Sequence, residues 1–248
     1  MDNRAIILAA GRGSRMGEET DSKPKCLTKL AGKYLLDWQL EALRSAGIKN
    51  ITVIRGYRSE MLSGNFDIVD NVRWMNTNMV ASLFCAPPFK GDTIISYSDI
   101  VYNSEHIEKL NASHGEITIT ADSSWEELWS KRFENLLNDA ETFKSINYIL
   151  QEIGKKTDDI TDIEAQYMGL LKLTEKGWQT MFDLFQTFSD AKRDEMDMTG
   201  MLNDLVMREV EINVVFVDGG WCEVDNYSDV VIYEKELKEK DYWKHDWR

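Results

Sequence analysis

The chain has 248 residues, 43% of them hydrophobic, and a formal net charge of −14, so it is long enough for a substantial core and strongly acidic. That charge argues against nucleic acid as a partner, and no stretch approaches the roughly 20 apolar residues that a membrane-spanning helix needs. The three cysteines and three histidines are scattered, which argues against a disulfide scaffold and against a zinc site built from them.

Positive charge collects near the N-terminus of this acidic chain. Residues 1–60 contain 11 Lys or Arg and 7 Asp or Glu. A bound anion would explain this concentration, and a solvated surface is the alternative. The chain leads from Met1 directly into an apolar segment, which leaves no room for a secretory signal. We therefore expect a cytoplasmic protein that does not insert into membranes.

The first predicted strand, residues 4–9, leads into a glycine-rich loop that is followed at short range by Lys23-Pro24-Lys25. Two glycines allow a tight turn and a close approach of the backbone to a ligand. Consecutive N–H groups of such a loop can point at anionic oxygens, and Arg15 and Lys25 add two fixed positive charges. This pattern predicts a nucleoside triphosphate site. Its loop residues are Leu8, Ala10, Gly11, Gly13 and Ser14.

Two other phosphate-binding motifs fit this loop poorly. The dinucleotide fingerprint needs a third glycine where this chain has Met16, and an acidic residue after the second strand where it has Arg55. A Walker loop ends in Gly-Lys-Ser/Thr, whereas this one continues Met16-Gly17-Glu18. Neither motif is therefore favoured.

The first half of the chain alternates predicted strands and helices. Strands are expected over residues 5–8, 51–54, 72–75, 93–97 and 116–121, and helices over 35–43, 58–62, 80–85 and 104–112. This alternation predicts an α/β fold with a Rossmann-like, mostly parallel sheet and helices on both faces. Ligands of such sheets lie beyond the carboxyl ends of the strands, where Gly11 and Asp99 both stand.

The pattern changes after about residue 121. Trp125, Trp129 and Arg132 share one face of a predicted helix. The later strands are expected over 145–152, 166–173 and 211–217, and the later helices over 178–188, 199–208 and 230–240. Because no linker or repeat divides the chain, we expect a single domain. It would comprise a nucleotide-binding core (1–121), a smaller acceptor-binding lobe (122–210) and a closing segment (211–248).

The glycine loop and Lys-Pro-Lys resemble the signature of the sugar-nucleotidyltransferase superfamily, Leu-Ala-Ala-Gly-x-Gly-Ser/Thr-Arg followed by Lys-Pro-Lys. Ser98-Asp99 looks like the family's first metal aspartate, and Asp225 in Trp-Cys-Glu-Val-Asp looks like its second. The resemblance implies a nucleotidyltransferase fold, Mg²⁺ held by Asp99 and Asp225, and catalytic roles for Arg15 and Lys25.

Residues 125–141 and 164–169 resemble the phosphocholine cytidylyltransferase-like branch of that superfamily, which also includes phosphonate cytidylyltransferases. Two departures count against a sugar 1-phosphate as the acceptor. Asn78-x-x-x-Ser82 replaces the Gly-Thr-Ala segment of many sugar-1-phosphate enzymes, and Glu-Ile-Gly-Lys-Lys at 152–156 replaces their Glu-Lys-Pro motif. Asn78 and Ser82 are assigned to the nucleotide site.

The implied reaction joins two anions. An oxygen of the acceptor's phosphate or phosphonate attacks the α-phosphorus of CTP in line and expels pyrophosphate, so catalysis is mainly positioning and charge neutralisation. Mg²⁺ held by hard carboxylates bridges the phosphates. Lys25 and Arg15 stabilise the charge that develops on the phosphoryl oxygens.

The acceptor is expected to be a small zwitterion, with phosphocholine favoured over 2-aminoethylphosphonate. A quaternary ammonium group prefers tryptophan and tyrosine faces, and two tryptophans lie beside Arg132 on one helix. Ordinary core packing of these rings is the alternative. The residues assigned to acceptor binding are Trp125, Trp129, Lys155, Tyr167, Asp197 and Trp221.

Two alternative functions and one question about the C-terminal tail stay open. One is a sugar-1-phosphate nucleotidyltransferase that uses UTP or dTTP. Another is a catalytically inactive nucleotide-sensing homologue, against which the presence of Arg15, Lys25 and both aspartates argues. The third concerns the tail, whose aromatic residues can pack back onto the core or form a homodimer contact. They are Tyr242, Trp243 and Trp247.

Overall fold

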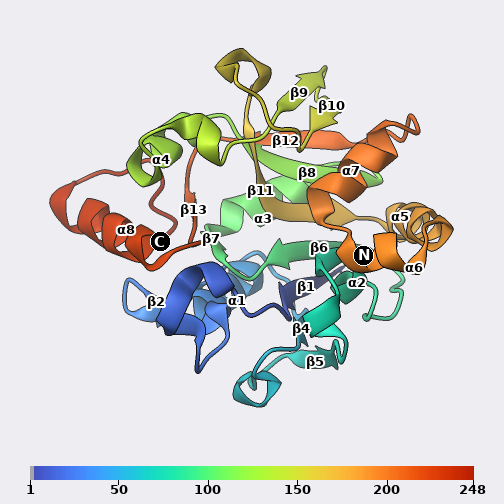
Figure 1. The fold of residues 1–248 in the computed structure, drawn as a ribbon, viewed down its shortest axis with the longest axis horizontal. Helices are drawn as coiled ribbons and strands as arrows, with labels where there is room; N and C mark the ends of the chain where they lie inside the picture. The colour runs from blue at the N-terminus through green and yellow to red at the C-terminus, as the bar shows by residue number, and fades with distance from the viewer. Residues whose placement is uncertain (1–2) are drawn as a thin grey trace.

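A nine-stranded sheet organises the computed structural model, which describes residues 3–248 (Figure 1). The strand order across the sheet is β5-β4-β1-β6-β11-β8-β12-β10-β9. In chain order the strands are β1 (Asn3–Ala9), β4 (Asn50–Arg55), β5 (Asp67–Asp70), β6 (Asp92–Tyr97), β8 (Ile117–Asp122), β9 (Phe143–Ile146), β10 (Ile149–Ile153), β11 (Gln166–Leu173) and β12 (Asn213–Val217).

The sheet is mixed but mostly parallel, as predicted. β1 pairs in parallel with β4 and β6, β4 with β5, and β8 with β12. Two strands run against the other seven: β11, which is antiparallel to β6 and β8 in the middle of the sheet, and β10, which is antiparallel to β12 and β9 near its edge. β11 brings residues of the second half of the chain into the middle of the sheet.

Helices cover both faces of the sheet, which confirms the predicted fold class. On one face pack α1 (Leu35–Ser45), α3 (Ser104–Ala112), α4 (Trp125–Arg132) and α8 (Tyr227–Glu239). On the other pack α2 (Met79–Leu83), α5 (Glu175–Thr187) and α7 (Met198–Val206), while the short α6 (Asp190–Glu195) precedes α7. Within residues 3–248, no helix combines the length and the apolar character needed to cross a membrane.

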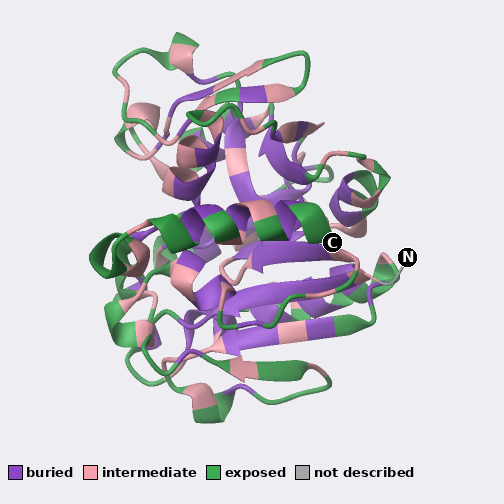
Figure 2. Ribbon diagram, turned by 90° about the vertical axis from the view of Figure 1, so that its right-hand side faces the viewer, coloured by how far each residue is buried: buried purple, intermediate pink, exposed green. Residues whose placement is uncertain are grey.

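The sequence of β1 is continuously apolar because its side chains are buried on both faces of the sheet. Successive side chains of a strand point to opposite faces. Ala5 and Ile7 therefore enter one core cluster, while Ile6 and Leu8 enter the other. Because helices cover both faces, both sets are buried, as expected for the parallel part of such a sheet. Figure 2 shows these buried strands between helices that are exposed on their outer sides.

A second, two-stranded sheet closes one side of the molecule and was not predicted. β7 (Ile100–Tyr102) pairs antiparallel with β13 (Trp221–Glu223), so that Glu223 lies opposite Ile100. The next backbone N–H, that of Val224, donates to the carbonyl of Asp99 at 2.9 Å. This pairing carries the C-terminal acidic motif to the end of β6. The other two-stranded sheet is the hairpin of β2 (Lys29–Leu30) and β3 (Lys33–Tyr34).

Two predicted strands differ in the structure. The segment 72–75 is not a strand: β5 lies earlier in the chain, and Asn71 starts a turn by accepting a hydrogen bond from the N–H of Arg73 at 2.9 Å. The segment 145–152 is a hairpin of β9 and β10, because Asn147 and Tyr148 adopt positive φ angles of 51° and 64°. Paired positive φ values are typical of tight hairpin turns.

Two of the three aromatic residues of the tail pack back onto the core. Trp243 and Trp247 are 4% and 2% exposed, and Trp247 meets Trp38 of α1 edge to face with 5.9 Å between ring centroids. Tyr242 is 78% exposed. The division of the chain into 1–121, 122–210 and 211–248, and a homodimer, stay predictions.

Candidate active site

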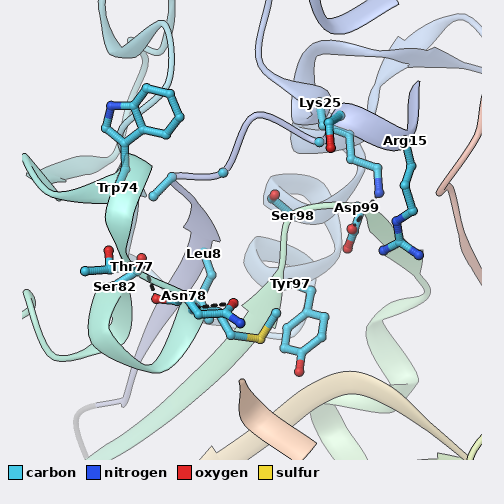
Figure 3. Close-up of a pocket in the computed structure, with 15 residues that line it drawn as sticks. Leu8, Arg15, Lys25, Trp74, Thr77, Asn78, Ser82, Tyr97, Ser98 and Asp99 are labelled. Atoms are coloured by element: carbon cyan, nitrogen blue, oxygen red, sulfur yellow. Dashed lines mark hydrogen bonds and ion pairs between the residues drawn. The ribbon is translucent and has the colours of Figure 1, made fainter. Parts of the chain in front are cut away.

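A cavity of about 260 Å³ opens at the carboxyl ends of β1 and β6 (Figure 3). Ten of the residues assigned from sequence line it. They are Leu8, Ala10, Gly11, Gly13, Ser14, Arg15, Lys25, Asn78, Ser82 and Asp99. The sequence did not single out the other lining residues, Trp74, Thr77, Met79, Tyr97 and Ser98.

The cavity has a charged end and an uncharged end. Figure 3 shows Arg15, Lys25 and Asp99 close together on one side and Asn78 and Ser82 on the other. A nucleotide has the same division, because its phosphates are charged while its base offers hydrogen-bonding edges and an apolar ring. The geometry therefore suits a nucleotide that lies along the cavity with its phosphates near Lys25.

Two glycines shape the loop after β1 in different ways. Gly13 has a φ of +69°, and a Cβ there would lie 2.7 Å from Cβ of Lys25, so a side chain would collide with the lysine stem. A Cβ on Gly11 would meet no atom within 4 Å. Since Gly11 lines the cavity, its missing side chain leaves space that a ligand can occupy, which is one recurring use of glycine.

Lys25 joins the two predicted metal aspartates. Its Nζ lies 2.8 Å from Oδ2 of Asp99 and 3.0 Å from Oδ1 of Asp225. The lysine side chain is only 7% exposed. The charges of Asp99 and Asp225 outweigh the effect of burial and raise the pKa of Lys25 above its ordinary value. Lys25 is therefore a fixed positive charge at this end of the cavity.

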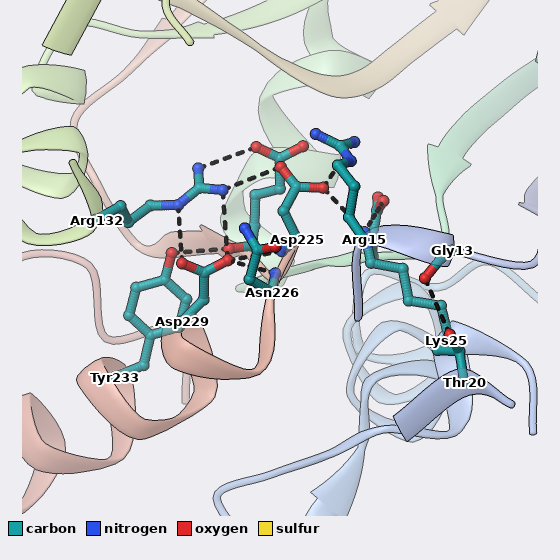
Figure 4. A network of polar contacts seen from close by, with 11 residues as sticks. Gly13, Arg15, Thr20, Lys25, Arg132, Asp225, Asn226, Asp229 and Tyr233 are labelled. Atoms are coloured by element: carbon teal, nitrogen blue, oxygen red, sulfur yellow. Dashed lines mark hydrogen bonds and ion pairs between the residues drawn. The ribbon is translucent and has the colours of Figure 1, made fainter. Parts of the chain in front are cut away.

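Asp225 is shared by three cations (Figure 4). Besides Lys25, Nη2 of Arg15 lies 2.8 Å from its Oδ1 and Nη2 of Arg132 lies 3.0 Å from its Oδ2. Burial works against the charged form, but Lys25 and Arg15 hold the pKa of Asp225 below its ordinary value. The carboxylate thus stays ionised in the folded protein.

Arg132 organises the acidic segment from the opposite side. Its side chain is fully buried at the end of α4, and it also pairs with Glu223 at 3.1 Å and Asp229 at 3.3 Å. Oδ2 of Asp229 accepts hydrogen bonds from the backbone N–H groups of Asp225 and Asn226, at 2.8 and 2.9 Å, where α8 begins. A carboxylate at a helix N-terminus also interacts favourably with the helix dipole. Arg132 and Asp229 together fix the backbone that presents Asp225.

Three carboxylates at the charged end could hold a divalent metal. Their ligand oxygens, from Asp99, Glu223 and Asp225, all lie within 4.8 Å of one another. Oδ1 of Asp99 is buried and has no hydrogen-bond partner among the described residues. Burial and the charge of Asp225 raise the pKa of Glu223 to about 8 although Arg132 opposes this shift. Hard oxygen donors with unmatched negative charge suit Mg²⁺, so this donor set fits the metal.

The uncharged end is held by one buried amide. Nδ2 of Asn71 donates to Oγ1 of Thr77 and to Oγ of Ser82, both at 2.9 Å, and Asn71 is 3% exposed. Asn78 caps α2 by accepting from the N–H of Met79 at 2.8 Å. These bonds fix the hydroxyl and amide groups that face the cavity.

The three tryptophans assigned to the acceptor belong to the core. Trp125, Trp129 and Trp221 are 1%, 3% and 1% exposed, and none lines the cavity. Trp125 and Trp129 meet each other edge to face, with 6.1 Å between ring centroids. The indole N–H of Trp221 donates to the buried Asp122 at 2.8 Å. Their burial favours core packing, the alternative to a cation cage, and the i, i+4 spacing of Trp125 and Trp129 marks the buried face of α4.

The other three acceptor assignments lie on separate elements. Lys155 pairs with Glu152 at 2.9 Å on the surface. Asp197 caps α7 by accepting from the N–H of Gly200 at 2.7 Å. Tyr167 meets Tyr97 of the cavity wall edge to face, with 5.9 Å between ring centroids. Tyr167 is thus in contact with a residue that lines the main cavity.

The sequence contained signals for two missed residues. Glu223 stands two positions before Asp225 in an extended segment, a spacing that places both carboxylates on one side of a strand. Arg132 is a cation on the apolar face of α4, and a buried cation requires acidic partners. Neither signal identifies which residue Glu223 or Arg132 contacts. Those contacts are seen only in the folded structure.

Comparison with known proteins shows the family to which the chain belongs. A family described as the MobA-like NTP transferase domain matches residues 5–154. The chain is 39% identical to the CTP:phosphoglutamine cytidylyltransferase of Campylobacter jejuni, over 92% of this chain and 98% of that protein. It is 33% identical to the 2-aminoethylphosphonate cytidylyltransferase of Lancefieldella rimae, over 42% of this chain and 45% of that protein.

Among solved structures, the inositol-1-phosphate CTP transferase of T. maritima matches with a TM-score of 0.74. The match covers 97% of this chain and 98% of that one at 18% identity, and this likeness concerns the fold.

Replacement of Arg132 by methionine should strongly destabilise the protein. The variant leaves three carboxylates without their shared buried cation, and loss of one partner of a buried pair costs about 3–5 kcal/mol. The matched control is Lys131→Met, whose pair with Glu236 at 3.4 Å is partly exposed and should be worth less than about 1 kcal/mol. Urea unfolding of both variants measures the difference, and equal stabilities would contradict the assigned role of Arg132.

Proposed function

The chain belongs to the MobA-like NTP transferase family and is cytidylyltransferase-like, and on this premise we propose that it transfers CMP from CTP to a small acceptor that carries a phosphate or phosphonate. Pyrophosphate is the second product. The observation that supports the proposal is the division of one cavity into an uncharged end and an end lined by Arg15, Lys25 and Asp99, with the carboxylates of Glu223 and Asp225 next to that of Asp99.

The residues of the charged end suit the in-line displacement. The loop at Gly11–Gly13 holds the triphosphate against the end of β1, and Lys25 and Arg15 face the oxygens on which negative charge increases. Asp99, Glu223 and Asp225 would hold Mg²⁺, which when bound supplies positive charge to the phosphates and to the attacking oxygen. The acceptor oxygen is already anionic, so no protein base is required to activate it.

For the acceptor we propose a compound with a primary amine or amide, such as phosphoglutamine or 2-aminoethylphosphonate. The names of the relatives from C. jejuni and L. rimae support this choice. Phosphocholine drew its support from a cage of Trp125, Trp129 and Trp221, and these rings are buried in the core. Phosphocholine therefore becomes the second candidate.

A panel of nucleotides and acceptors tests the proposal. Pyrophosphate release should require both CTP and an acceptor, and phosphoglutamine or 2-aminoethylphosphonate should give the largest kcat/KM. Asp99→Asn should reduce turnover by at least about 100-fold, as expected when one fixed electrostatic contact to the transition state is lost, without loss of folding. The control is Asp92→Asn, outside the cavity. Turnover of glucose 1-phosphate with UTP, and none with CTP, would contradict the proposal.

Lys25→Met should separate metal binding from turnover. Turnover should fall about 100- to 1,000-fold, because the transition state loses a fixed charge. Mn²⁺, used in place of Mg²⁺, should bind more tightly, by about tenfold, because Nζ no longer occupies the space between Asp99 and Asp225.

Electron paramagnetic resonance of free Mn²⁺ measures this affinity without any substrate. The matched control is Lys23→Met, whose pair with Glu19 at 3.2 Å lies on the surface. Weaker Mn²⁺ binding by Lys25→Met would show that the metal lies elsewhere.

A further inference from the structure

A pair of tyrosines separates the main cavity from a second, smaller one. Tyr97, at the end of β6, lines the main cavity, and Tyr167, at the start of β11, lines the second. The two rings meet edge to face at 87° with 5.9 Å between centroids. The tyrosine pair therefore borders both cavities. Within it, Tyr97 lies at the end of β6, close in sequence to Asp99.

A distortion of β11 creates this arrangement. The pairing of β11 with β8 shifts register between Tyr167 and Leu171, and Gly169 in that interval has a φ of +75°. A Cβ at Gly169 would lie 2.5 Å from the ring of Tyr97, so only glycine leaves room for the tyrosine. Bulges of this kind often occur beside active sites, where they redirect side chains.

The second cavity is small and lined with polar groups. Its volume is about 40 Å³, enough for a few water-sized groups. Its polar lining comes from Glu141, Thr142, Gln166, Tyr167 and Thr199. The hydroxyl of Tyr167 is buried next to that of Tyr97 and makes no well-formed hydrogen bond among residues 3–248. A buried polar atom without a partner is costly, so this hydroxyl is suited to bind a ligand.

The charges around the second cavity are mainly negative. Burial raises the pKa of Glu141; Lys156 opposes this shift, while Asp197 and Asp139 add to it. Two carboxylates, Asp139 and Asp197, and one lysine thus lie near Glu141, and this excess of negative charge favours a cationic or N–H-bearing group over an anion.

We propose that this second cavity binds the nitrogen-bearing end of the acceptor, and that Glu141 and the Tyr167 hydroxyl accept its N–H hydrogen bonds. The inference rests on the proposed function and names the acceptor class: a compound with a primary ammonium or amide group a short chain away from its phosphate or phosphonate. That chain passes Tyr97, so the anionic end reaches the region of Asp99 and Lys25.

Trimethylated nitrogen fits this cavity poorly. It has no N–H to donate, so it leaves the oxygens of Glu141 and Tyr167 without hydrogen bonds. An aromatic face could compensate, but the rings of Tyr97 and Tyr167 are packed against each other and, for Tyr97, against Gly169. The cavity therefore discriminates between amines that differ only in methylation.

Phosphoethanolamine and phosphocholine form a matched pair for the test, since they differ only in the three methyl groups. The wild-type enzyme should show at least tenfold higher kcat/KM for phosphoethanolamine. Glu141→Gln should raise the KM for phosphoethanolamine about 10- to 100-fold, the effect of losing a charged hydrogen bond, with kcat and the KM for CTP within about twofold. Tyr167→Phe should raise the same KM about fivefold.

Glu164→Gln is the control. Glu164 lies near the same strand but accepts hydrogen bonds from Ser145 at 2.9 and 3.0 Å, and it lines neither cavity. The KM for phosphoethanolamine should not change in this variant. A preference of the wild type for phosphocholine, or the same KM in Glu141→Gln and Glu164→Gln, would overturn the inference.

Isothermal titration calorimetry separates this inference from the proposed function. It measures how tightly phosphoethanolamine and phosphocholine bind to the enzyme that holds a non-reactive α,β-methylene analogue of CTP. If phosphoethanolamine binds more tightly than phosphocholine, and Glu141→Gln removes this difference, the second cavity binds the amine even if the enzyme transfers no CMP in the activity assay. Transfer of CMP with equal binding of both amines would leave the proposed function intact and overturn the inference. Failure of both amines to bind would also overturn it.

Discussion

The site depends on one buried carboxylate that three cations share. Asp225 meets Arg15 at 2.8 Å and Lys25 at 3.0 Å through one oxygen, and Arg132 at 3.0 Å through the other. These residues come from the glycine loop, the Lys-Pro-Lys segment, α4 and the start of α8, so one charge joins segments that are far apart in sequence. An unpaired carboxylate in this position would be strongly unfavourable. The buried Lys25 and Arg132 in turn need acidic partners, whereas Arg15 is 62% exposed.

This arrangement also explains how an acidic protein can accept a triphosphate. The cations Arg15, Lys25 and Arg132 face four carboxylates, those of Asp99, Glu223, Asp225 and Asp229. With more carboxylates than cations, this site would repel a triphosphate unless a divalent metal ion were also bound. In the function we propose, Asp99, Glu223 and Asp225 would hold the metal, and Lys25 would then be available to the phosphates.

Much of the fold could be predicted from sequence, and the limits are physical. The alternation of apolar strands and amphipathic helices predicted the sheet and both helical layers, because burial on two faces leaves a clear pattern in a strand such as β1. The edge strand β5 has no such pattern: Asp67 and Asp70 flank only two apolar residues. The pairing of β7 with β13 was missed because three-residue strands carry little pattern, and their partners are more than 100 positions apart.

Some residues of the candidate site could likewise be predicted from sequence, and others could not. The glycine loop and Asp99 were recognisable because their chemistry is local, at the end of one strand. Arg132 and Glu223 depend on contacts across the fold. The sequence could not show whether the tryptophans of α4 bind a ligand or pack in the core, because an apolar helical face looks the same in both cases. Tyr97 and Gly169 became meaningful only when β11 was placed beside β6.

We propose that Asp99 and Asp225, joined here through Lys25, would hold the metal next to the phosphates of CTP. Anomalous X-ray scattering from a crystal of the protein with CTP and Mn²⁺ would locate the metal. We expect a manganese peak between these two carboxylates, with Nζ of Lys25 moved to a phosphate oxygen and the base beside Asn78 and Ser82. A peak elsewhere, or Lys25 still bridging Asp99 and Asp225 with CTP bound, would contradict this assignment.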